Sequence, residues 1–243
     1  MSRSAVVLLL ALAACAPRQS AGPVTAEPAG PRLPDEVQWV RNSAEHEAIF
    51  RQVFRAAGEA LRERAVNARP GTWATVLDAD ETSIDNSEFE RDLALTTEPY
   101  DENAWNDWVR RKEATALPGA VEYVRLARGL GGRVIIVTNR AAEVCDETRE
   151  NLNAVGIVAD LVLCKPEGES DKNLRFARIA NGTAAPNLPP LEVLVWVGDN
   201  IRDFPGLSQE LRHAPDSAFG EFGRSYFMLP NPMYGSWEQN PGE

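Results

Sequence analysis

The segment Thr75-Val76-Leu77-Asp78-Ala79-Asp80-Glu81-Thr82-Ser83-Ile84-Asp85-Asn86 decides how this chain is interpreted. An apolar run typical of a buried β-strand ends in two aspartates at positions i and i+2. Carboxylates at such a place are costly unless a cation or hydrogen bonds compensate them. One aspartate of the pair can attack phosphorus while the other transfers a proton. The alternative is an N-capped helix start, where Asp and Thr are also common.

Apolar runs that alternate with helical patterns extend on both sides of this segment. They predict an α/β fold with a doubly wound, mainly parallel sheet. A polar and irregular stretch interrupts the alternation at about 86–117, with one short helix around Trp105 and Trp108. The expected strands are 73–77, 133–137, 160–164, 193–197 and 226–229, and the expected helices are 34–68, 118–127, 142–155 and 171–179.

Polar residues follow four of the predicted strands. In a doubly wound sheet, ligands bind at the carboxyl ends of the strands, so these residues are expected to meet in one crevice. Each group also has an ordinary structural interpretation, such as a turn, a helix cap or a solvated lysine. The residues are Asp78 and Asp80, then Thr138, Asn139 and Arg140, then Lys172, and finally Asp199 and Asp203.

The ordered set resembles the haloacid dehalogenase (HAD) superfamily of phosphatases: Asp-x-Asp-x-Thr, a Thr, a Lys, then Gly-Asp-x-x-x-Asp. A narrower resemblance to the class C acid phosphatases, the outer-membrane lipoprotein e and 5′-nucleotidase family of subfamily IIIB, covers nearly everything after Trp39. The segments that carry it are Asp80-Glu81-Thr82 with Asp85-Asn86, Ala104-Trp105-Asn106-Asp107-Trp108-Val109, Pro118-Gly119-Ala120, Thr138-Asn139-Arg140, Asp171-Lys172-Asn173-Leu174-Arg175-Phe176, Gly198-Asp199-Asn200 with Asp203-Phe204, and Leu229-Pro230-Asn231-Pro232-Met233-Tyr234-Gly235.

This resemblance implies a HAD-like Rossmannoid domain with a small, largely helical cap. It implies an acid phosphatase in which Asp78 attacks the phosphate and forms an aspartyl-phosphate. Asp80 protonates the leaving alkoxide and then activates water. Lys172 pairs with the nucleophile and the phosphate. Lys165, which is closer to the end of its strand, is the rival for that role, and Asp-Lys-x-x-Arg-Phe favours Lys172.

The resemblance also implies a Mg²⁺ cofactor, because Mg²⁺ prefers oxygen ligands and can neutralise phosphate charge. Its implied ligands are the Asp78 carboxylate, the Asp80 backbone carbonyl and the Asp199 carboxylate. Asp203 and Thr82 are expected to support them. An N-cap of the next helix is the other interpretation of Asp203.

The expected substrate is a small phosphorylated molecule, and the resemblance indicates a nucleoside 5′-monophosphate. Thr138 and Asn139 are expected to hold phosphate oxygens. In the family, aromatic residues at the positions of Trp105 and Tyr234 sandwich the base, and stacking tolerates any base. Trp108 is expected to be a core residue of the cap instead, and Phe89 is a weaker candidate for the pocket wall. Asp85 and Asn86 are interpreted as loop-stabilising residues.

Two other functions remain open from the sequence. The first is a broad phosphomonoesterase or phosphotransferase without nucleotide preference. The second is a surface lipoprotein that binds a ligand without catalysis. A net charge of −11 argues against a partner that is polymeric nucleic acid. A homodimer is also considered, although the chain continues only briefly after Tyr234 where the family usually has a further segment.

The N-terminus has the pattern of an export signal. Residues 1–14 carry Arg3 and an apolar run that is short for a membrane span, and they end just before Cys15. This pattern resembles a lipoprotein signal, so we expect a lipidated Cys15 and a flexible tether over 15–33. A plain signal peptide is the alternative. The domain is then 34–243, anchored in a bacterial envelope, in the outer membrane and facing the periplasm or the surface.

The two remaining cysteines, Cys145 and Cys164, fit either of two interpretations. They can form a disulfide in an oxidising compartment. They can equally be small buried apolar residues, because the sequence does not show whether the geometry of a disulfide is met.

Overall fold

The computed structural model describes residues 32–96 and 98–242. From Leu33 onward the chain forms one compact unit. The predicted signal peptide, the lipidation at Cys15 and nearly all of the predicted tether lie outside the described residues. Within the described ranges, none of the helices combines the length and the apolar character that a membrane crossing requires.

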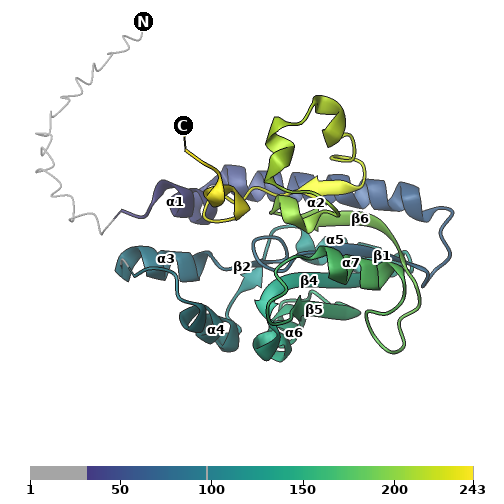
Figure 1. Cartoon of the computed structure of the whole chain (residues 1–243), viewed down its shortest axis with the longest axis horizontal. Coiled ribbons are helices and arrows are strands. Elements are labelled where there is room, and N and C mark those ends of the chain that lie inside the picture. Colours follow the sequence, from purple (N-terminus) through teal and green to yellow (C-terminus); the bar gives the residue numbers. More distant parts are fainter. Residues whose placement is uncertain (1–31, 97, 243) are drawn as a thin grey trace, which may run out of the picture. The chain divides into compact units, whose positions relative to one another are not determined.

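Five parallel strands form the central sheet, in the order β5-β4-β1-β6-β7 (Figure 1). The strand that precedes Asp78 lies at the centre, with Leu77 opposite Ile136 of β4 and Val197 of β6. The carboxyl ends of these three strands are therefore adjacent. The predicted doubly wound α/β fold is confirmed. The strands are β1 (Trp73–Leu77), β4 (Arg133–Ala141), β5 (Leu161–Lys165), β6 (Glu192–Gly198) and β7 (Tyr226–Met228).

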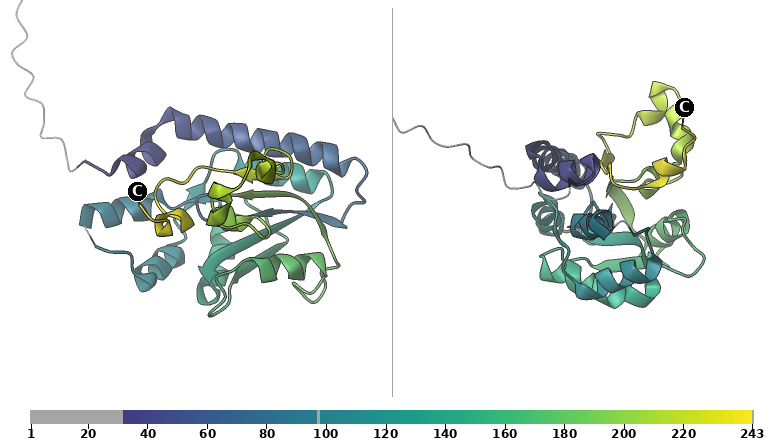
Figure 2. Two further views of the ribbon diagram at one scale, coloured as in Figure 1. Left: turned by 45° about the horizontal axis from the view of Figure 1, so that its top comes forward. Right: turned by 90° about the vertical axis from the view of Figure 1, so that its left-hand side faces the viewer.

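Helices cover both faces of this sheet, as two views of the ribbon show (Figure 2). The helices α2 (Ala44–Ala65), α5 (Ala120–Gly129) and α6 (Cys145–Ala154) contribute to one hydrophobic cluster, and α7 (Asn173–Ala180) contributes to the other. Short 3-10 segments complete the fold at Ala142–Val144, Ile201–Asp203, Gln209–His213, Asp216–Phe219 and Ser236–Gln239.

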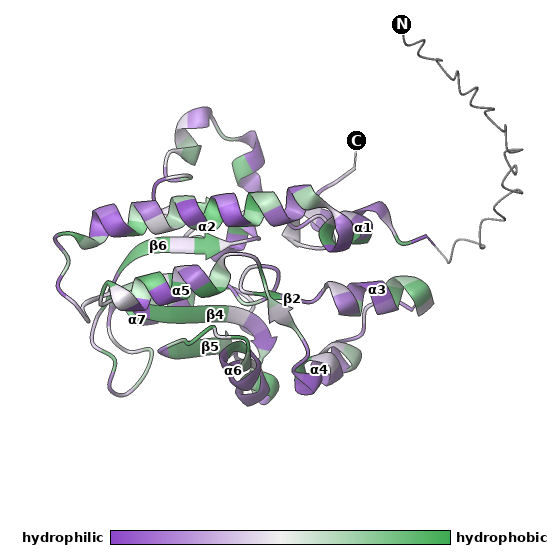
Figure 3. Cartoon of the chain, turned by 180° about the vertical axis from the view of Figure 1, so that it is seen from behind, coloured by the Kyte–Doolittle hydropathy of each residue, from purple (hydrophilic) through white to green (hydrophobic). Residues whose placement is uncertain are grey.

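The central strand β1 is buried along its whole length, as expected for a strand that is covered on both faces. Its side chains alternate: Trp73 and Leu77 belong to one cluster, Ala74 and Val76 to the other. Figure 3 shows the resulting hydrophobic colouring of the sheet. Only a glycine fits opposite Trp73, because a Cβ on Gly132 would lie 2.1 Å from the indole ring.

The N-terminal helical region differs from its prediction. Instead of one helix over 34–68, the structure has α1 (Asp35–Asn42) and α2, separated at Ser43. Ser43 has an extended backbone, and its side chain accepts a hydrogen bond from the His46 N–H at 3.0 Å. A serine that caps a helix in this way ends the preceding one, which explains the break.

The region predicted to be irregular, with one short helix around Trp105 and Trp108, contains two helices: α4 (Glu102–Arg111), which includes both tryptophans, and α3 (Ser87–Thr96), which was not predicted. Asp101 caps the start of α4 by accepting from two backbone N–H groups, and Lys112 ends it in a left-handed conformation. A small antiparallel pair, β2 (Ile84–Asp85) and β3 (Thr115–Ala116), joins this cap to the core. The cap helices lie beyond the carboxyl ends of the strands (Figures 1 and 3).

Cys145 and Cys164 form a disulfide, with their Cα atoms 5.9 Å apart. It joins the first residue of α6 to β5. The sequence left this pairing open, and the structure supports the interpretation as a disulfide.

We expect a Cys145→Ala, Cys164→Ala double variant to unfold at a lower temperature than the oxidised wild type. The bond closes a loop with a sequence separation of 19 residues. For a loop of this length, loop-closure entropy contributes roughly 3 kcal/mol, or about 6–12 °C in Tm. Calorimetry with and without reductant measures the effect. Reductant should lower the Tm of the wild type and leave the variant unchanged; equal Tm values for wild type and variant would contradict this prediction.

Candidate active site

A buried lysine links two aspartates at the carboxyl edge of the sheet. Lys172 Nζ lies 2.7 Å from Asp78 Oδ1 and 2.7 Å from Asp203 Oδ1. Burial alone would lower the pKa of Lys172, but the carboxylates of Asp203 and Asp78 outweigh it, so the pKa is raised and the ammonium stays charged. Asp78 directly follows β1, and Lys172 directly precedes α7. Lys172 therefore places a positive charge at the carboxyl edge of the sheet, although it belongs to none of the strands.

Asp203 is held in place by the backbone around it. Its Oδ2 accepts from the Asn200 N–H at 2.8 Å, so both of its oxygens are engaged. Gly198 lies directly against it: a Cβ at that position would be 2.3 Å from the Asp203 Cβ. The glycine that precedes Asp199 is thus required by the close approach of Asp203. Asp203 does not cap a following helix; it is the last residue of the short segment Ile201–Asp203.

Asp199 completes a cluster of carboxylates that could hold a metal ion. One oxygen each from Asp78, Asp199 and Asp203 lie within 4.8 Å of one another. Thr82 Oγ1 donates to Asp199 Oδ1 at 2.9 Å, and Asn231 Nδ2 donates to Oδ2 at 3.0 Å. Burial raises the pKa of Asp78, and burial with the charge of Asp203 raises the pKa of Asp199 to about 7. An all-oxygen donor set short of positive charge fits a hard divalent cation.

Asp80 is bound by a separate set of groups. Arg140 Nε donates to its Oδ1 at 2.8 Å, and Asn86 Nδ2 donates to the same oxygen at 2.9 Å. Thr138 Oγ1 lies 3.4 Å from Oδ2. The sequence placed Arg140 in the predicted crevice without a specific role and indicated a loop-stabilising role for Asn86; the signal for their contact with Asp80 is their place in the resembled motifs.

Thr138 and Asn139 lie in the last part of β4, and a buried arginine fixes them. Arg175 Nη1 donates to the Thr138 carbonyl oxygen at 2.6 Å, and its Nη2 donates to Asn139 Oδ1 at 2.6 Å. Arg175 lies on α7, one turn after Lys172. By contrast, Lys165 pairs with Glu102 at 3.4 Å. The structure therefore brings Lys172 to Asp78 and leaves Lys165 with the cap.

A cavity of about 690 Å³ opens above these groups. Trp105 of the cap and Tyr234 of the C-terminal segment both line it. Phe89 is buried behind Trp105, with ring centroids 5.1 Å apart, and does not line the cavity. Trp108 is 3% exposed and belongs to the core, as the sequence analysis expected. The cavity also contains Asp78, Asp80, Asn139, Arg140, Lys172, Asp199 and Asp203.

Tyr234 is fixed by a residue of the Asp80 loop. Its hydroxyl donates to Glu81 Oε2 at 2.5 Å. Glu81 also accepts two hydrogen bonds from Asn86, one from the backbone N–H and one from the side-chain amide. The backbone of Glu81 is left-handed, with φ of 52°. Burial raises the pKa of Glu81, and the charge of Asp80 adds to this. No local sequence pattern indicates this role of Glu81, because its partner lies 153 positions away.

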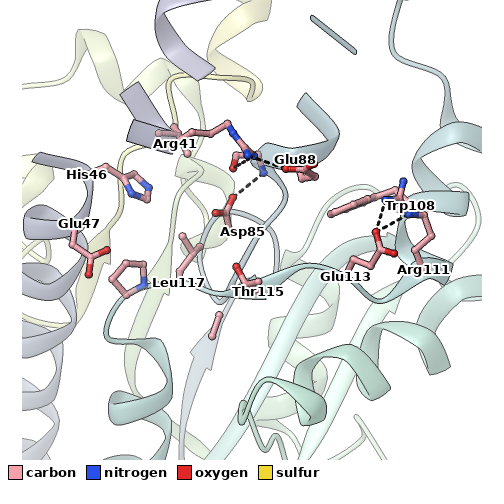
Figure 4. Close-up of a pocket in the computed structure, with 14 residues that line it drawn as sticks. Arg41, His46, Glu47, Asp85, Glu88, Trp108, Arg111, Glu113, Thr115 and Leu117 are labelled. Atoms are coloured by element: carbon pink, nitrogen blue, oxygen red, sulfur yellow. Dashed lines mark hydrogen bonds and ion pairs between the residues drawn. The ribbon is translucent and has the colours of Figure 1, made fainter. Parts of the chain in front are cut away.

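A second cavity, of about 600 Å³, lies among α1, α2, β2 and α4 (Figure 4). Its arginines are already paired: Arg41 with Glu88 at 2.8 Å, and Arg111 with Glu113. Within the described part of the chain, its lining includes none of the predicted catalytic or metal-binding residues. Trp108 lines this second cavity, and its Nε1 donates to Asn86 Oδ1 at 2.9 Å.

Comparisons with known proteins agree with this geometry. A family model described as "HAD superfamily, subfamily IIIB (Acid phosphatase)" matches residues 14–237. The structure of the class C acid phosphatase from Bacillus anthracis is similar with a TM-score of 0.75 and 26% identity, covering 84% of this chain and 85% of that one. The Bacillus anthracis enzyme with tungstate bound gives a TM-score of 0.74 at the same identity and the same coverage of each chain.

Glu90 of α3 lines the active-site cavity, and the ionisation of its side chain can be tested. Burial, with the charge of Glu238 added, raises the pKa of Glu90 from 4.5 to about 7. Folding therefore favours its protonated form. The stability that this provides is fully present below pH 4.5 and is lost as the pH rises through 7.

We expect Glu90→Gln to be neutral near pH 4.5 and stabilising above pH 7, because glutamine does not ionise. The gain should be roughly 1–2 kcal/mol once solvent screening is allowed for. Denaturant unfolding of both proteins at pH 4.5 and pH 8 measures it. A difference in stability that does not change between the two pH values would contradict the raised pKa.

Proposed function

Since this chain belongs to the acid phosphatases of HAD superfamily subfamily IIIB, we propose that its substrates are nucleoside 5′-monophosphates and its metal is Mg²⁺. Hydrolysis of phosphomonoesters follows from the family itself. The observation that carries the rest is the buried ion pair at 2.7 Å between Asp78 and Lys172, next to two further aspartates and below two aromatic residues.

In the proposed reaction, an Asp78 oxygen attacks phosphorus and forms an aspartyl-phosphate as the P–O bond to the leaving group breaks. Asp80 gives its proton to the leaving oxygen, so the product leaves as an alcohol. Lys172 stays charged beside the phosphoryl group and stabilises its negative charge. Thr138 and Asn139 hold the remaining phosphate oxygens.

The second half of the reaction restores the enzyme. Asp80, now ionised, accepts a proton from a water molecule, which attacks the phosphorus of the aspartyl-phosphate. The P–O bond to Asp78 breaks, and inorganic phosphate is released. Both steps use the same carboxyl group in opposite protonation states. This accords with activity at acidic pH.

HAD phosphatases use a divalent metal, and the acidic cluster of this chain provides suitable ligands. We assign it to Mg²⁺, held by the carboxylates of Asp78 and Asp199 and by the Asp80 carbonyl. When bound, the ion supplies positive charge for the phosphate oxygens. Asp203 and Thr82 would orient the ligands, because one binds Lys172 and the other binds Asp199. The tungstate bound to the Bacillus anthracis enzyme, a tetrahedral oxyanion like phosphate, supports an oxyanion site here.

The preference for nucleotides rests on Trp105 and Tyr234. Both line the cavity that contains Asp78, and base stacking on aromatic side chains contributes about 1–3 kcal/mol per base. The Tyr234 hydroxyl is occupied by Glu81, so the residue would offer its ring rather than its polar end. A broad phosphomonoesterase would not depend on either ring.

We propose that the protein is located in the bacterial envelope, at the outer membrane, where a lipidated Cys15 anchors the domain. The support comes from the sequence around Cys15 and from the Cys145–Cys164 disulfide, a bond typical of oxidising compartments. Labelling with a radioactive fatty acid tests it: label on the wild type and none on Cys15→Ser is expected.

We expect Asp78→Asn to lower kcat at least about 10³-fold, because an amide cannot act as the nucleophile. The Tm should not fall, since the substitution removes a buried charge. The matched control is Asp85→Asn in the same loop, where asparagine can still cap α3. Steady-state kinetics with 4-nitrophenyl phosphate gives the result, and substantial turnover by Asp78→Asn would rule out the nucleophile assignment.

Metal removal should abolish activity and Mg²⁺ should restore it. Without the ion, Lys172 offers only one positive charge to the crowded carboxylates, and their excess negative charge repels the substrate phosphate. The measurement is turnover after chelation, followed by titration with Mg²⁺ and, separately, Ca²⁺. Full activity in excess chelator would refute a metal-dependent site, and recovery only with a metal other than Mg²⁺ would refute the assignment of the ion.

Trp105→Ala and Tyr234→Ala should raise KM for a nucleoside 5′-monophosphate by roughly 5–100-fold, the equivalent of losing one stacking contact. KM for a small aliphatic phosphate, such as glycerol 2-phosphate, should change much less. Trp237→Ala is the control, because this exposed tryptophan does not line the cavity. Parallel increases for both substrates would favour the broad phosphomonoesterase.

A further inference from the structure

The two oxygens of the Asp80 carboxylate have very different surroundings. Three donor nitrogens converge on Oδ1: Arg140 Nε and Nη2, each at 2.8 Å, and Asn86 Nδ2 at 2.9 Å. Only Thr138 Oγ1 approaches Oδ2, at a long 3.4 Å. An oxygen whose lone pairs already accept two hydrogen bonds, one of them from a cation that also forms an ion pair with it, is a poor place for a proton. The proton that Asp80 transfers therefore belongs on Oδ2.

Arg140 is the main cause of this asymmetry. It is 1% exposed, so its charge is taken out of water, and Asp80 is the carboxylate with which it forms an ion pair in the described residues. Its guanidinium donates through Nε to Asp80 Oδ1, and its Nη2 lies 2.8 Å from the same oxygen while it donates to Asn86. The guanidinium also lies over the Trp105 ring, 5.6 Å from its centroid. The arginine is thus held from the cap side while it holds Asp80.

Asn86 fixes the arginine and the aspartate relative to each other. Its Nδ2 donates to Asp80 Oδ1 and to Glu81 Oε2, both at 2.9 Å. Its Oδ1 accepts from Arg140 Nη2 and from Trp108 Nε1, both at 2.9 Å. All four hydrogen-bonding positions of this fully buried amide are used, so it cannot rotate without losing bonds.

From this geometry we infer that Arg140 and Asn86 are positioning residues, which engage Oδ1 of Asp80 and leave Oδ2 as the oxygen that serves the leaving group. As the P–O bond breaks, the Oδ2–H bond breaks as well, and the leaving oxygen takes the proton. Asp80 is left as a carboxylate whose charge Arg140 already balances. The inference rests on the proposed role of Asp80 as general acid, and neither residue needs to contact the substrate.

A comparison of two leaving groups tests this inference. The substrates are benzyl phosphate and 4-nitrophenyl phosphate, which are similar in size but release a basic alkoxide and a stable phenolate, respectively. Only the alkoxide needs a proton as it leaves. A displaced general acid should therefore lower kcat/KM for benzyl phosphate far more than for 4-nitrophenyl phosphate, since general acid catalysis contributes about 10²–10⁴-fold.

We expect Arg140→Met and Asn86→Ala to lower the ratio of the two kcat/KM values, benzyl over 4-nitrophenyl, at least about 10-fold. Arg140→Lys keeps the charge but loses the guanidinium, whose Nε binds Asp80 and whose Nη2 binds Asn86, so it should shift the ratio in the same direction. This last variant keeps the test decisive if either of the others unfolds. Lys165→Met is the control, because Lys165 pairs with Glu102 instead, and the ratio should stay unchanged.

Loss of stability without a change of ratio would overturn the inference, because a purely structural role lowers both rates equally. Asp80→Asn provides the reference and should show the largest shift. An unchanged ratio in Asp80→Asn would overturn the general-acid role itself. A large shift in Asp80→Asn with no shift in Arg140→Lys, Arg140→Met or Asn86→Ala would overturn only the positioning role.

Discussion

Mutual repulsion among carboxylates at the edge of the sheet is the constraint on which the rest of the site depends. Asp78, Asp199 and Asp203 place oxygens within 4.8 Å of one another, in buried surroundings where like charges repel strongly. Lys172 supplies one positive charge against three negative ones. The remaining charge of about −2 is what a divalent cation neutralises. The fold thus creates the need for the cofactor by ending β1 and β6 side by side.

The carboxylate of Asp80, the proposed general acid, also needs a positively charged partner, and it has a different one. Asp80 lies only two residues from Asp78, yet its charge is balanced by Arg140 and not by Lys172. The two carboxylates therefore have different charge partners although they share one loop. A nucleophile must stay ionised and a general acid must carry a proton, so this separation of their partners is what the chemistry requires.

The sequence predicted the five strands and the residues at their ends well, because buried parallel strands are continuous apolar runs and their carboxyl ends share one edge. It predicted the cap in part: the short helix around Trp105 and Trp108 is α4, whose ends are set by Asp101 and the left-handed Lys112, whereas α3 was not predicted. It also could not indicate that Glu81 binds Tyr234 or that Arg140 binds Asp80. Those contacts bring together segments that are far apart in the chain, and no local pattern encodes the distance between them.

The aromatic walls of the cavity are fastened to the same loop that carries the acid. Trp105 lies against Arg140, which binds Asp80, and Tyr234 binds Glu81, the residue after Asp80. A change of either ring therefore alters more than the stacking surface. If the aromatic residues did not contact the loop of the general acid, their substitution could change substrate selectivity without changing proton transfer. Here the contacts that would select the substrate also hold the general acid, so selectivity and proton transfer must vary together.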